Sequence, residues 1–388
     1  MNAGLTSTKL FGDEVAKQLP APGRLLPTYA RQDVTFVEGD GAWLVDTEGR
    51  RYLDLLAGIA VVGLGHRHPA PLAAARAQLE RLWHVSNLFW TEPMEELAAR
   101  LSGRFGGAAA FFCNSGAESV EAALKWARKA TGRTEVVALE GSFHGRTLGA
   151  LSVTGQPAKR AAFEPLLPGA RFATPATLAE HVGPQTAAIL LEPVQGEGGV
   201  HPLAPETLAE ARALADEHGA LLVLDEVQTG VGRCGSFFAF ERLGVRPDAV
   251  TLAKGLANGL PIGTFLVSEA APTAFEPGDH ASTFGGNPVA CAAACAVVDA
   301  VDDELLAHVR GVSDRLAAGL ARFGEVRGLG LLLAVELDRP AAPIAVEGLA
   351  HGFVVGTAGE RVLRLTPPLT LTHEEADLAL DLLAEVVP

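Results

Sequence analysis

The middle of the chain contains short apolar runs that do not alternate with polar residues. They cover residues 109–113, 135–139, 187–191, 221–224 and 249–252. Such runs are typical of strands buried on both faces of a parallel sheet, although a piece of buried helix can give the same pattern. Helical segments are predicted between several runs, notably at 118–130 and 205–218. The pattern predicts an α/β layer with a mainly parallel sheet flanked by helices.

The two ends of the chain follow other patterns. Residues 34–54 alternate around two turn signals, which predicts an antiparallel meander. Residues 262–267 predict another strand, residues 288–323 one helical stretch, and residues 328–337 and 361–365 further strands.

A capping box, Thr372-His373-Glu374-Glu375, predicts a final helix with Leu378, Leu382 and Leu383 on its apolar face. We therefore expect an N-terminal segment, 1–60, that contributes its meander to a small domain. Residues 61–290 would form a large domain, and residues 291–388 a smaller α+β domain.

Composition and charge exclude several classes of protein. The net charge is −15, and no cluster of Lys and Arg offers a surface for nucleic acid or an anionic membrane. The longest apolar stretch, 288–298, is shorter than the ~18 residues of a membrane span. Residues 1–20 contain Asp13 and Glu14 and lack the apolar region of a signal peptide. We expect a soluble cytoplasmic enzyme.

Cysteine and histidine spacing predicts neither a disulfide framework nor a metal site. The four cysteines include no C-x-x-C, and small buried thiols are the simplest interpretation. His66 and His68 form a metal-like pair without a third ligand nearby in the sequence. No metal is expected.

Polar motifs follow each of the five predicted strands. These are Asn114-Ser115-Gly116, residues 141–146, residues 192–197, Asp225-Glu226-Val227-Gln228 and Lys254-Gly255. In α/β folds, ligands bind beyond the carboxyl ends of the strands. The five motifs are therefore expected to converge on one site.

A glycine pattern offers a competing interpretation. Residues 230–235 fit G-x-G-x-x-G, and Asp248 lies at a suitable distance for a nicotinamide-dependent oxidoreductase, NAD(P) being the cofactor. A dinucleotide fingerprint must turn directly from strand into helix, whereas residues 225–229 intervene here. No lysine precedes Ser or Thr, which excludes a phosphate-binding P-loop.

Lys254, one of only six lysines, is the strongest chemical candidate. By itself it could be a strand-end lysine that extends to solvent. A desolvated lysine, however, can offer a neutral amine to a carbonyl cofactor. Pyridoxal phosphate also needs a carboxylate at its ring nitrogen, which Asp225 can supply, and amides for its phosphate, which a helix opening at Ser115-Gly116-Ala117 provides. Phe143 could stack on the ring.

With these residues in place, the chain resembles the class III pyridoxal-phosphate-dependent aminotransferases of fold type I. The resemblance extends from Pro27 to Pro367. Its motifs are YLDLLAGIAVVGLGHRHP, FFCNSGAESVEAALK, GSFHGRTLGALS, LEPVQGEGG, LLVLDEVQTGVGR, LAKGLANGLPIG and STFGGNP. It implies a large domain that binds pyridoxal 5'-phosphate, a smaller α+β domain, and a homodimer with active sites at the subunit interface.

The resemblance implies a role for each cofactor-binding position. Lys254 would attach the cofactor and then carry the proton, Asp225 would pair with the ring nitrogen, and Gln228 would bond the phenolic oxygen. Glu226 and Val227 belong to the same motif. The remaining cofactor contacts would come from Phe143, Ser115, Gly116, Ala117 and, from the neighbouring subunit, Thr283.

The resemblance also implies how substrates are held. Arg146 would bind the distal carboxylate with Ser282 nearby, and Arg364 would bind the α-carboxylate of glutamate or 2-oxoglutarate. Glu197 would mask Arg364 when an ω-amine donor binds. The alternative for Glu197 is a structural residue in a glycine-rich turn.

The reaction implied is transfer of an ω-amine to 2-oxoglutarate, with N2-acetyl-L-ornithine as the expected donor. Ornithine, succinylornithine and γ-aminobutyrate are alternatives because enzymes for them share most of the motifs. Ser119-Val120 stands where many enzymes acting on acetylornithine have Ala-Asn, a departure that bears on the donor rather than on the class.

Overall fold

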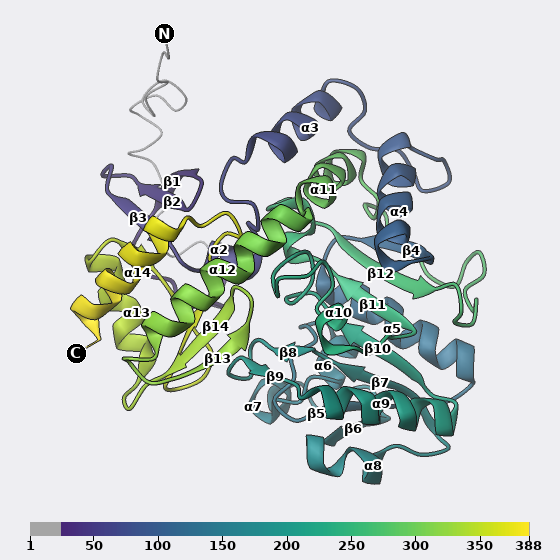
Figure 1. Ribbon diagram of the computed structural model, residues 1–388. Helices are drawn as coiled ribbons and strands as arrows, with labels where there is room; N and C mark the ends of the chain where they lie inside the picture. The colour runs from purple at the N-terminus through teal and green to yellow at the C-terminus, as the bar shows by residue number, and fades with distance from the viewer. Residues whose placement is uncertain (1–24, 388) are drawn as a thin grey trace.

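The computed structural model describes residues 25–387, and its largest element is a seven-stranded sheet (Figure 1). In spatial order the strands are β4 (Ala108–Cys113), β12 (Gly263–Ser268), β11 (Ala249–Leu252), β10 (Leu221–Asp225), β7 (Thr186–Leu191), β5 (Glu135–Leu139) and β6 (Ala170–Ala173). Each of the five central apolar runs lies in one of these strands. Residues 1–24, on which the signal-peptide expectation rests, are outside the described part.

The sheet is mixed because of one strand. β12 is antiparallel to both β11 and β4, while β11, β10, β7, β5 and β6 are parallel to one another. The mainly parallel α/β layer is therefore confirmed. All six residues of β7 and all five of β10 are buried, which explains why their sequences do not alternate.

Helices cover the sheet, and two of them correct the sequence prediction. α5 (Gly116–Thr131) and α9 (Pro205–His218) confirm the predicted helices. The single stretch expected at 288–323 is instead two helices, α11 (Pro288–Ala300) and α12 (Asp303–Leu320). Asp302 is extended, and its carboxylate accepts the N–H of Leu305 at 2.9 Å, so it caps a new helix.

The C-terminal part contains a second sheet of four strands. β13 (Glu325–Leu329), β14 (Leu332–Glu336), β17 (Val362–Leu365) and β16 (Gly356–Thr357) are neighbours in that order. The single strand predicted at 328–337 is wrong. Gly330 has a left-handed backbone, with φ of 58°, and turns the chain between β13 and β14, which pair as a hairpin.

The last helix, α14 (His373–Val386), begins at Thr372 with the predicted capping box. Its apolar face differs from the prediction. Leu378 is 37% exposed, whereas Leu380 and Leu383 are buried with Ala376 and Ala379. The extra buried alanines rotate the face away from Leu378.

The N-terminal meander joins the C-terminal part, as Figure 1 shows. β1 (Phe36–Asp40), β2 (Trp43–Asp46) and β3 (Arg51–Asp54) form antiparallel pairs, and β15 (Phe353–Val354) adds to β3 in parallel. Their apolar residues share one core with α12, α13 (Ala341–Ala350) and α14. The core of the large sheet includes the buried residues of α11 and continues to Leu306, in the first turn of α12. α11 therefore packs with the large part. The boundaries at 60 and 290 stay predictions.

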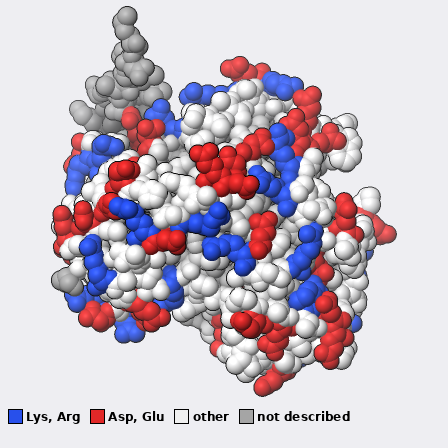
Figure 2. All heavy atoms as spheres, in the orientation of Figure 1, with Lys and Arg blue, Asp and Glu red and all other residues white. Residues whose placement is uncertain are grey.

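The surface carries charges of both signs (Figure 2), and the cysteines lie inside the molecule. Within residues 25–387, no helix is long and apolar enough to cross a membrane. On the face shown in Figure 2, acidic and basic side chains are interspersed. Cys113, Cys234, Cys291 and Cys295 are all buried free thiols. The described residues include no cluster of three or more His, Cys, Asp or Glu that could hold a metal.

Candidate active site

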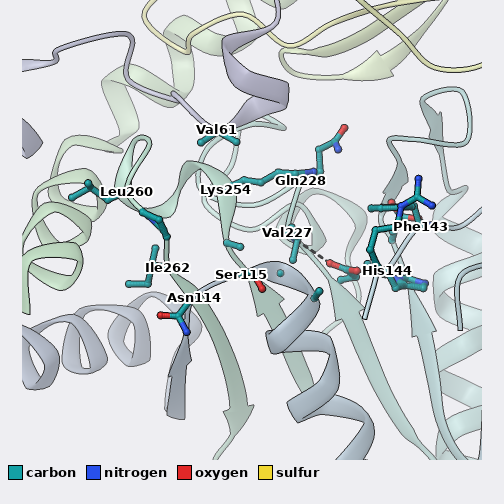
Figure 3. A pocket seen from close by; sticks show the side chains of 18 of the residues that line it. Val61, Asn114, Ser115, Phe143, His144, Val227, Gln228, Lys254, Leu260 and Ile262 are labelled. Atoms are coloured by element: carbon teal, nitrogen blue, oxygen red, sulfur yellow. Dashed lines mark hydrogen bonds and ion pairs between the residues drawn. The ribbon is translucent and has the colours of Figure 1, made fainter. Parts of the chain in front are cut away.

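A cavity of about 400 Å³ lies beyond the carboxyl ends of the central strands (Figure 3). Nine of the predicted site residues line it: Ser115, Gly116, Ala117, Phe143, Arg146, Asp225, Val227, Gln228 and Lys254. The volume is in the range of small-molecule sites. The strand-end motifs therefore meet in one place, as expected from the topology.

Lys254 lies two residues after the end of β11 and begins a short 3-10 turn, Lys254–Ala257. Its backbone is left-handed, with φ of 43°, a conformation that costs energy for a side chain other than glycine and is concentrated at functional sites. Burial lowers the pKa of its ammonium group to about 8, with the charge of Glu197 opposing the shift. A substantial neutral fraction near neutral pH makes Lys254 a suitable nucleophile.

Asp225, the last residue of β10, is held by three donors. Its Oδ1 accepts from the Thr251 hydroxyl at 2.9 Å and from the Val227 N–H at 3.1 Å. Its Oδ2 lies 2.7 Å from Nδ1 of His144. Burial alone would lower the pKa of His144, but the hydrogen bond and charge of Asp225 outweigh burial and raise it. The carboxylate is thus fixed at the cavity wall and retains lone pairs for a cationic ring nitrogen.

His144 was not predicted as a site residue, although it lies in the predicted Gly141–Arg146 motif. Its partner Asp225 is on β10, and β7 separates that strand from β5, which precedes the motif. The contact between His144 and Asp225 can be predicted only when the order of the strands in the sheet is known.

The first turn of α5 forms an anion-binding end of the cavity. Ser115 caps the helix, and its Oγ accepts the Glu118 N–H at 3.2 Å. Gly116 and Ala117 are the first two helical residues, whose N–H groups have no partner within the helix. A Cβ on Gly116 would lie 2.7 Å from Cγ1 of Val227, so only glycine fits between the helix and that side chain.

Phe143 and Arg146 come from the loop after β5, and Figure 3 shows Phe143 and His144 together on one side of the cavity. The guanidinium carbon of Arg146 is 5.4 Å from the centroid of the Phe143 ring. Glu192, a cavity residue that sequence reasoning missed, accepts the Phe143 N–H at 2.8 Å. Burial raises the pKa of Glu192 to about 7. It fixes the backbone that presents Phe143.

Arg364 and Glu197 form an ion pair beside the cavity. Arg364, on β17, is 3% exposed and also donates to the Gly196 carbonyl at 3.1 Å. Burial would raise the pKa of Glu197, but the adjacent Arg364 lowers it. A Cβ on Gly196 would lie 2.2 Å from Oε1 of Gln228, a cavity residue, so the glycine lets this pair approach the site.

Three predicted residues lie apart from the cavity. The Glu226 carboxylate accepts the N–H groups of Ala239 and Phe240 at 2.7 and 2.9 Å, and burial raises its pKa to about 8. Ser282 and Thr283 line a separate cavity of about 830 Å³. Ser282 still connects to the site, because its Oγ accepts from Asn114 at 3.0 Å and Asn114 lines the first cavity.

The G-x-G-x-x-G segment has no dinucleotide-binding geometry. Turns follow β10, and the next helix is the four-residue α10 (Phe240–Leu243). Arg233, within the motif, is buried and donates to the carbonyls of Leu331 and Pro367 at 2.9 and 2.6 Å. Asp248 pairs with Arg212 at 2.9 Å. The segment joins the two parts of the molecule.

The fold and the site together define a pyridoxal-phosphate enzyme of the aminotransferase type. The family described as Aminotransferase class-III matches residues 28–387, and the chain belongs to this family.

Three individual members of the family are similar to this chain over nearly its whole length. The acetylornithine aminotransferase of Corynebacterium efficiens is 48% identical over 384 residues, which covers 94% of this chain and 95% of that protein. The N-acetylornithine aminotransferase of Stenotrophomonas maltophilia K279a superposes with a TM-score of 0.81 at 37% identity, over 92% of this chain and 96% of that one. The ornithine aminotransferase of Toxoplasma gondii ME49 gives a TM-score of 0.89 at 31% identity, over 94% and 92%.

The cofactor is therefore pyridoxal 5'-phosphate, and the residues present fit it. The α5 N-terminus suits the phosphate, Asp225 suits a protonated ring nitrogen, and Lys254 can offer a neutral amine to the aldehyde. Phe143 and Val227 supply apolar surface for the ring. The enzyme is a pyridoxal-phosphate-dependent aminotransferase acting on small molecules.

Proposed function

We propose that the enzyme transfers the ω-amine of N2-acetyl-L-ornithine to 2-oxoglutarate, a step of arginine biosynthesis. The products are N-acetyl-L-glutamate 5-semialdehyde and L-glutamate. The observation that carries this proposal is the ion pair between buried Arg364 and partly buried Glu197, which lies beside the cavity that Arg146 lines. A site with one open and one masked arginine suits an ω-amine donor that alternates with a dicarboxylate. The 48% identity to a named acetylornithine aminotransferase supports the choice of donor.

The cavity residues named above have different roles in this reaction. When bound, the cofactor supplies an aldehyde that takes the amine and a ring that withdraws electrons from the carbon losing its proton. Asp225 keeps the ring nitrogen protonated, because its charge is buried and held by His144 and Thr251. Lys254 Nζ would accept the proton that leaves the substrate carbon and would return it on the cofactor side.

The remaining residues position the reactants. The α5 N-terminus and Ser115 would bind the phosphate, Gln228 would donate to the phenolic oxygen, and Phe143 would supply an apolar surface for the ring. Arg146 binds the carboxylate remote from the reacting carbon of either substrate, since a planar guanidinium suits bidentate recognition of a carboxylate. Ser282 is connected to the cavity through its hydrogen bond with Asn114.

The test is a comparison of donors with the purified holoenzyme. We expect kcat/KM for acetylornithine to exceed that for ornithine, succinylornithine and γ-aminobutyrate by at least about tenfold, since each donor differs at the end remote from the reacting amine. A higher value for any of the other three would replace the proposed donor but leave the aminotransferase class intact.

Replacing Glu197 with alanine should separate the two half-reactions. The bare Arg364 would attract the carboxylate of acetylornithine into a wrong orientation, whereas glutamate would bind more easily. We expect the acetylornithine half-reaction to slow by about tenfold or more relative to the glutamate half-reaction, a difference of ~1.4 kcal/mol. Single-turnover cofactor spectra measure each half-reaction. Equal slowing of both would show that Glu197 is a structural loop residue.

We also propose that the enzyme is a homodimer in which Thr283 reaches the partner's cofactor. Thr283 is exposed in the single chain and lines the larger cavity. Large apolar side chains around it are strongly exposed: Trp83 68%, Leu88 86%, Phe89 62%, Trp90 80% and Phe284 60%. Exposed apolar surface of this size is typical of a protein interface. A second copy covering it would bury these side chains and bring Thr283 to the neighbouring site.

We propose a cytoplasmic location, because the relatives with the same proposed activity are enzymes that act on small soluble metabolites.

A further inference from the structure

A short helix next to the Arg146 loop carries a lysine that the reaction described above does not use. This helix, α7 (Pro157–Arg160), is attached to the loop after β5. Gln156, which precedes it, donates to the carbonyls of Gly141 and Ser142 at 3.1 and 3.3 Å. The Gly155 N–H also donates to the Ser142 carbonyl at 3.0 Å. The position of α7 is therefore fixed relative to Phe143 and Arg146.

Lys159 on this helix shares an aromatic surface with Arg146. Its Nζ is 4.9 Å from the centroid of the Phe143 ring, and the guanidinium carbon of Arg146 is 5.4 Å from the same centroid. Phe143 and Arg146 line the cavity. Within residues 25–387, no carboxylate lies within 4.0 Å of the Lys159 ammonium group. Two cations are thus within about 5.4 Å of the centroid of one ring, and neither forms an ion pair with a carboxylate of this range.

The charged residues that influence Lys159 are residues of the active site. Burial lowers the pKa of its ammonium group, and the charges of Arg146 and Arg364 lower it further, while those of Glu197 and Glu192 oppose the shift. Partly desolvated cations that repel one another bind an anion more tightly than either would alone. A carboxylate bound next to Arg146 would therefore also be attracted by Lys159.

The adjacent basic residue has a different environment. The Arg160 guanidinium carbon lies 4.1 Å from the centroid of the Phe172 ring, on β6, and Arg160 is therefore engaged elsewhere. Of the two basic residues on α7, only Lys159 is directed to the ring that lines the cavity.

We propose that Lys159 is a specificity-determining residue that binds, together with Arg146, the substrate carboxylate remote from the reacting carbon. The proposal rests on the proposed function, because that carboxylate is the α-carboxylate of acetylornithine in the first half-reaction and the γ-carboxylate of glutamate in the second. Arg146 supplies a flat bidentate partner, and the lysine supplies a mobile point charge.

The first experiment compares Lys159→Met with the matched control Arg160→Met. The donors are acetylornithine and N-acetyl-1,4-diaminobutane, which lacks only the carboxylate. Single-turnover half-reactions of the holoenzymes give the maximal rate and the half-saturating concentration for each donor, including slow ones. For Lys159→Met we expect the half-saturating concentration of acetylornithine to rise about tenfold, with the maximal rate nearly unchanged. For the decarboxylated donor, the maximal rate and the half-saturating concentration should be the same in wild type, Lys159→Met and Arg160→Met.

The second experiment uses pH. Above the pKa of Lys159 its amine is neutral and no longer attracts the carboxylate, whereas arginine in Lys159→Arg stays charged throughout. The ratio of kcat/KM for acetylornithine, wild type over Lys159→Arg, should therefore fall as the pH rises from about 7 to about 10. Groups common to both proteins that titrate in this interval affect both values alike, so the ratio cancels their effect.

The outcomes separate this proposal from the proposed function. An equal loss for both donors in Lys159→Met would give Lys159 a structural role, and no loss for either would place it outside the site; both results overturn the proposal. Failure of the wild-type enzyme to react with acetylornithine would instead overturn the donor assignment. In that case glutamate, compared with its uncharged γ-amide glutamine, tests Lys159 in the other half-reaction.

Discussion

Replacing Lys254 with alanine should lower kcat for the complete transamination by at least about 10⁴-fold, the upper end of what one acid–base residue contributes. The variant loses both the amine that attaches the cofactor and the group that carries the proton. Steady-state assay with saturating acetylornithine and 2-oxoglutarate measures the loss. Borohydride reduction of the wild-type holoenzyme, followed by peptide mass spectrometry, should find the cofactor on Lys254.

Two further variants show which property of Lys254 is needed. Lys254→Arg keeps the positive charge but cannot become neutral near pH 7, so it should be as inactive as alanine. Lys129→Ala is the matched control. Lys129 forms two ion pairs at the surface, one with Glu276 at 3.2 Å and one with Asp279. Activity retained in Lys254→Arg would mean that charge, rather than proton transfer, is the contribution of this lysine.

Replacing Asp225 with asparagine should lower kcat by about 10³-fold, because a preorganised buried charge stabilises the charge that develops in the transition state. An amide can still accept from Thr251 and from the Val227 N–H, so the geometry of the cavity wall should survive. The ring nitrogen loses its anionic partner, however, and withdraws electrons less strongly. Single-turnover spectra should show both half-reactions slowed by a similar factor.

Stability and cofactor content must be followed in the same variant. Asp225 also pairs with buried His144, and removing one member of a buried charged pair costs about 3–5 kcal/mol. Denaturant unfolding of Asp225→Asn and of the double variant Asp225→Asn/His144→Asn therefore separates the loss of the pair from the loss of catalysis. A normal rate in folded, fully loaded Asp225→Asn would contradict the role of the carboxylate.

Much of the large sheet could be predicted because burial on two faces leaves a simple signature. Runs such as 187–191 and 221–224 contain only apolar residues, and each is a central strand. The ends of α11 and α12 were harder to find. Val301 continues the apolar pattern of the first helix. The break is marked only by the extended backbone of Asp302, whose side chain caps the next helix. The β13–β14 hairpin was missed for a similar reason, since a single glycine makes the turn.

The candidate site was predictable where a residue lies at or just beyond the end of an apolar strand, as Asp225 and Lys254 do. His144 and Glu192 were missed because their importance depends on the order of strands in space, and β10, β7 and β5 are not consecutive in the sequence. The Glu197–Arg364 pair joins residues separated by 167 positions. The resemblance to the family suggested it, but apolar periodicity alone carries no information on such a contact.

Arg364 and Lys254 are supplied by different cores of the molecule. Lys254 follows a strand of the large sheet, whereas Arg364 lies on β17 of the C-terminal sheet, and a small apolar cluster containing Val194 and Val362 joins the two. Proton transfer and recognition of the α-carboxylate of glutamate therefore depend on different parts of the molecule. A small shift of the C-terminal sheet against the large one would move Arg364 relative to Lys254 while leaving Lys254, Asp225 and Arg146 in place. The packing between the two sheets thus sets how well an α-carboxylate fits without altering the residues that transfer the proton.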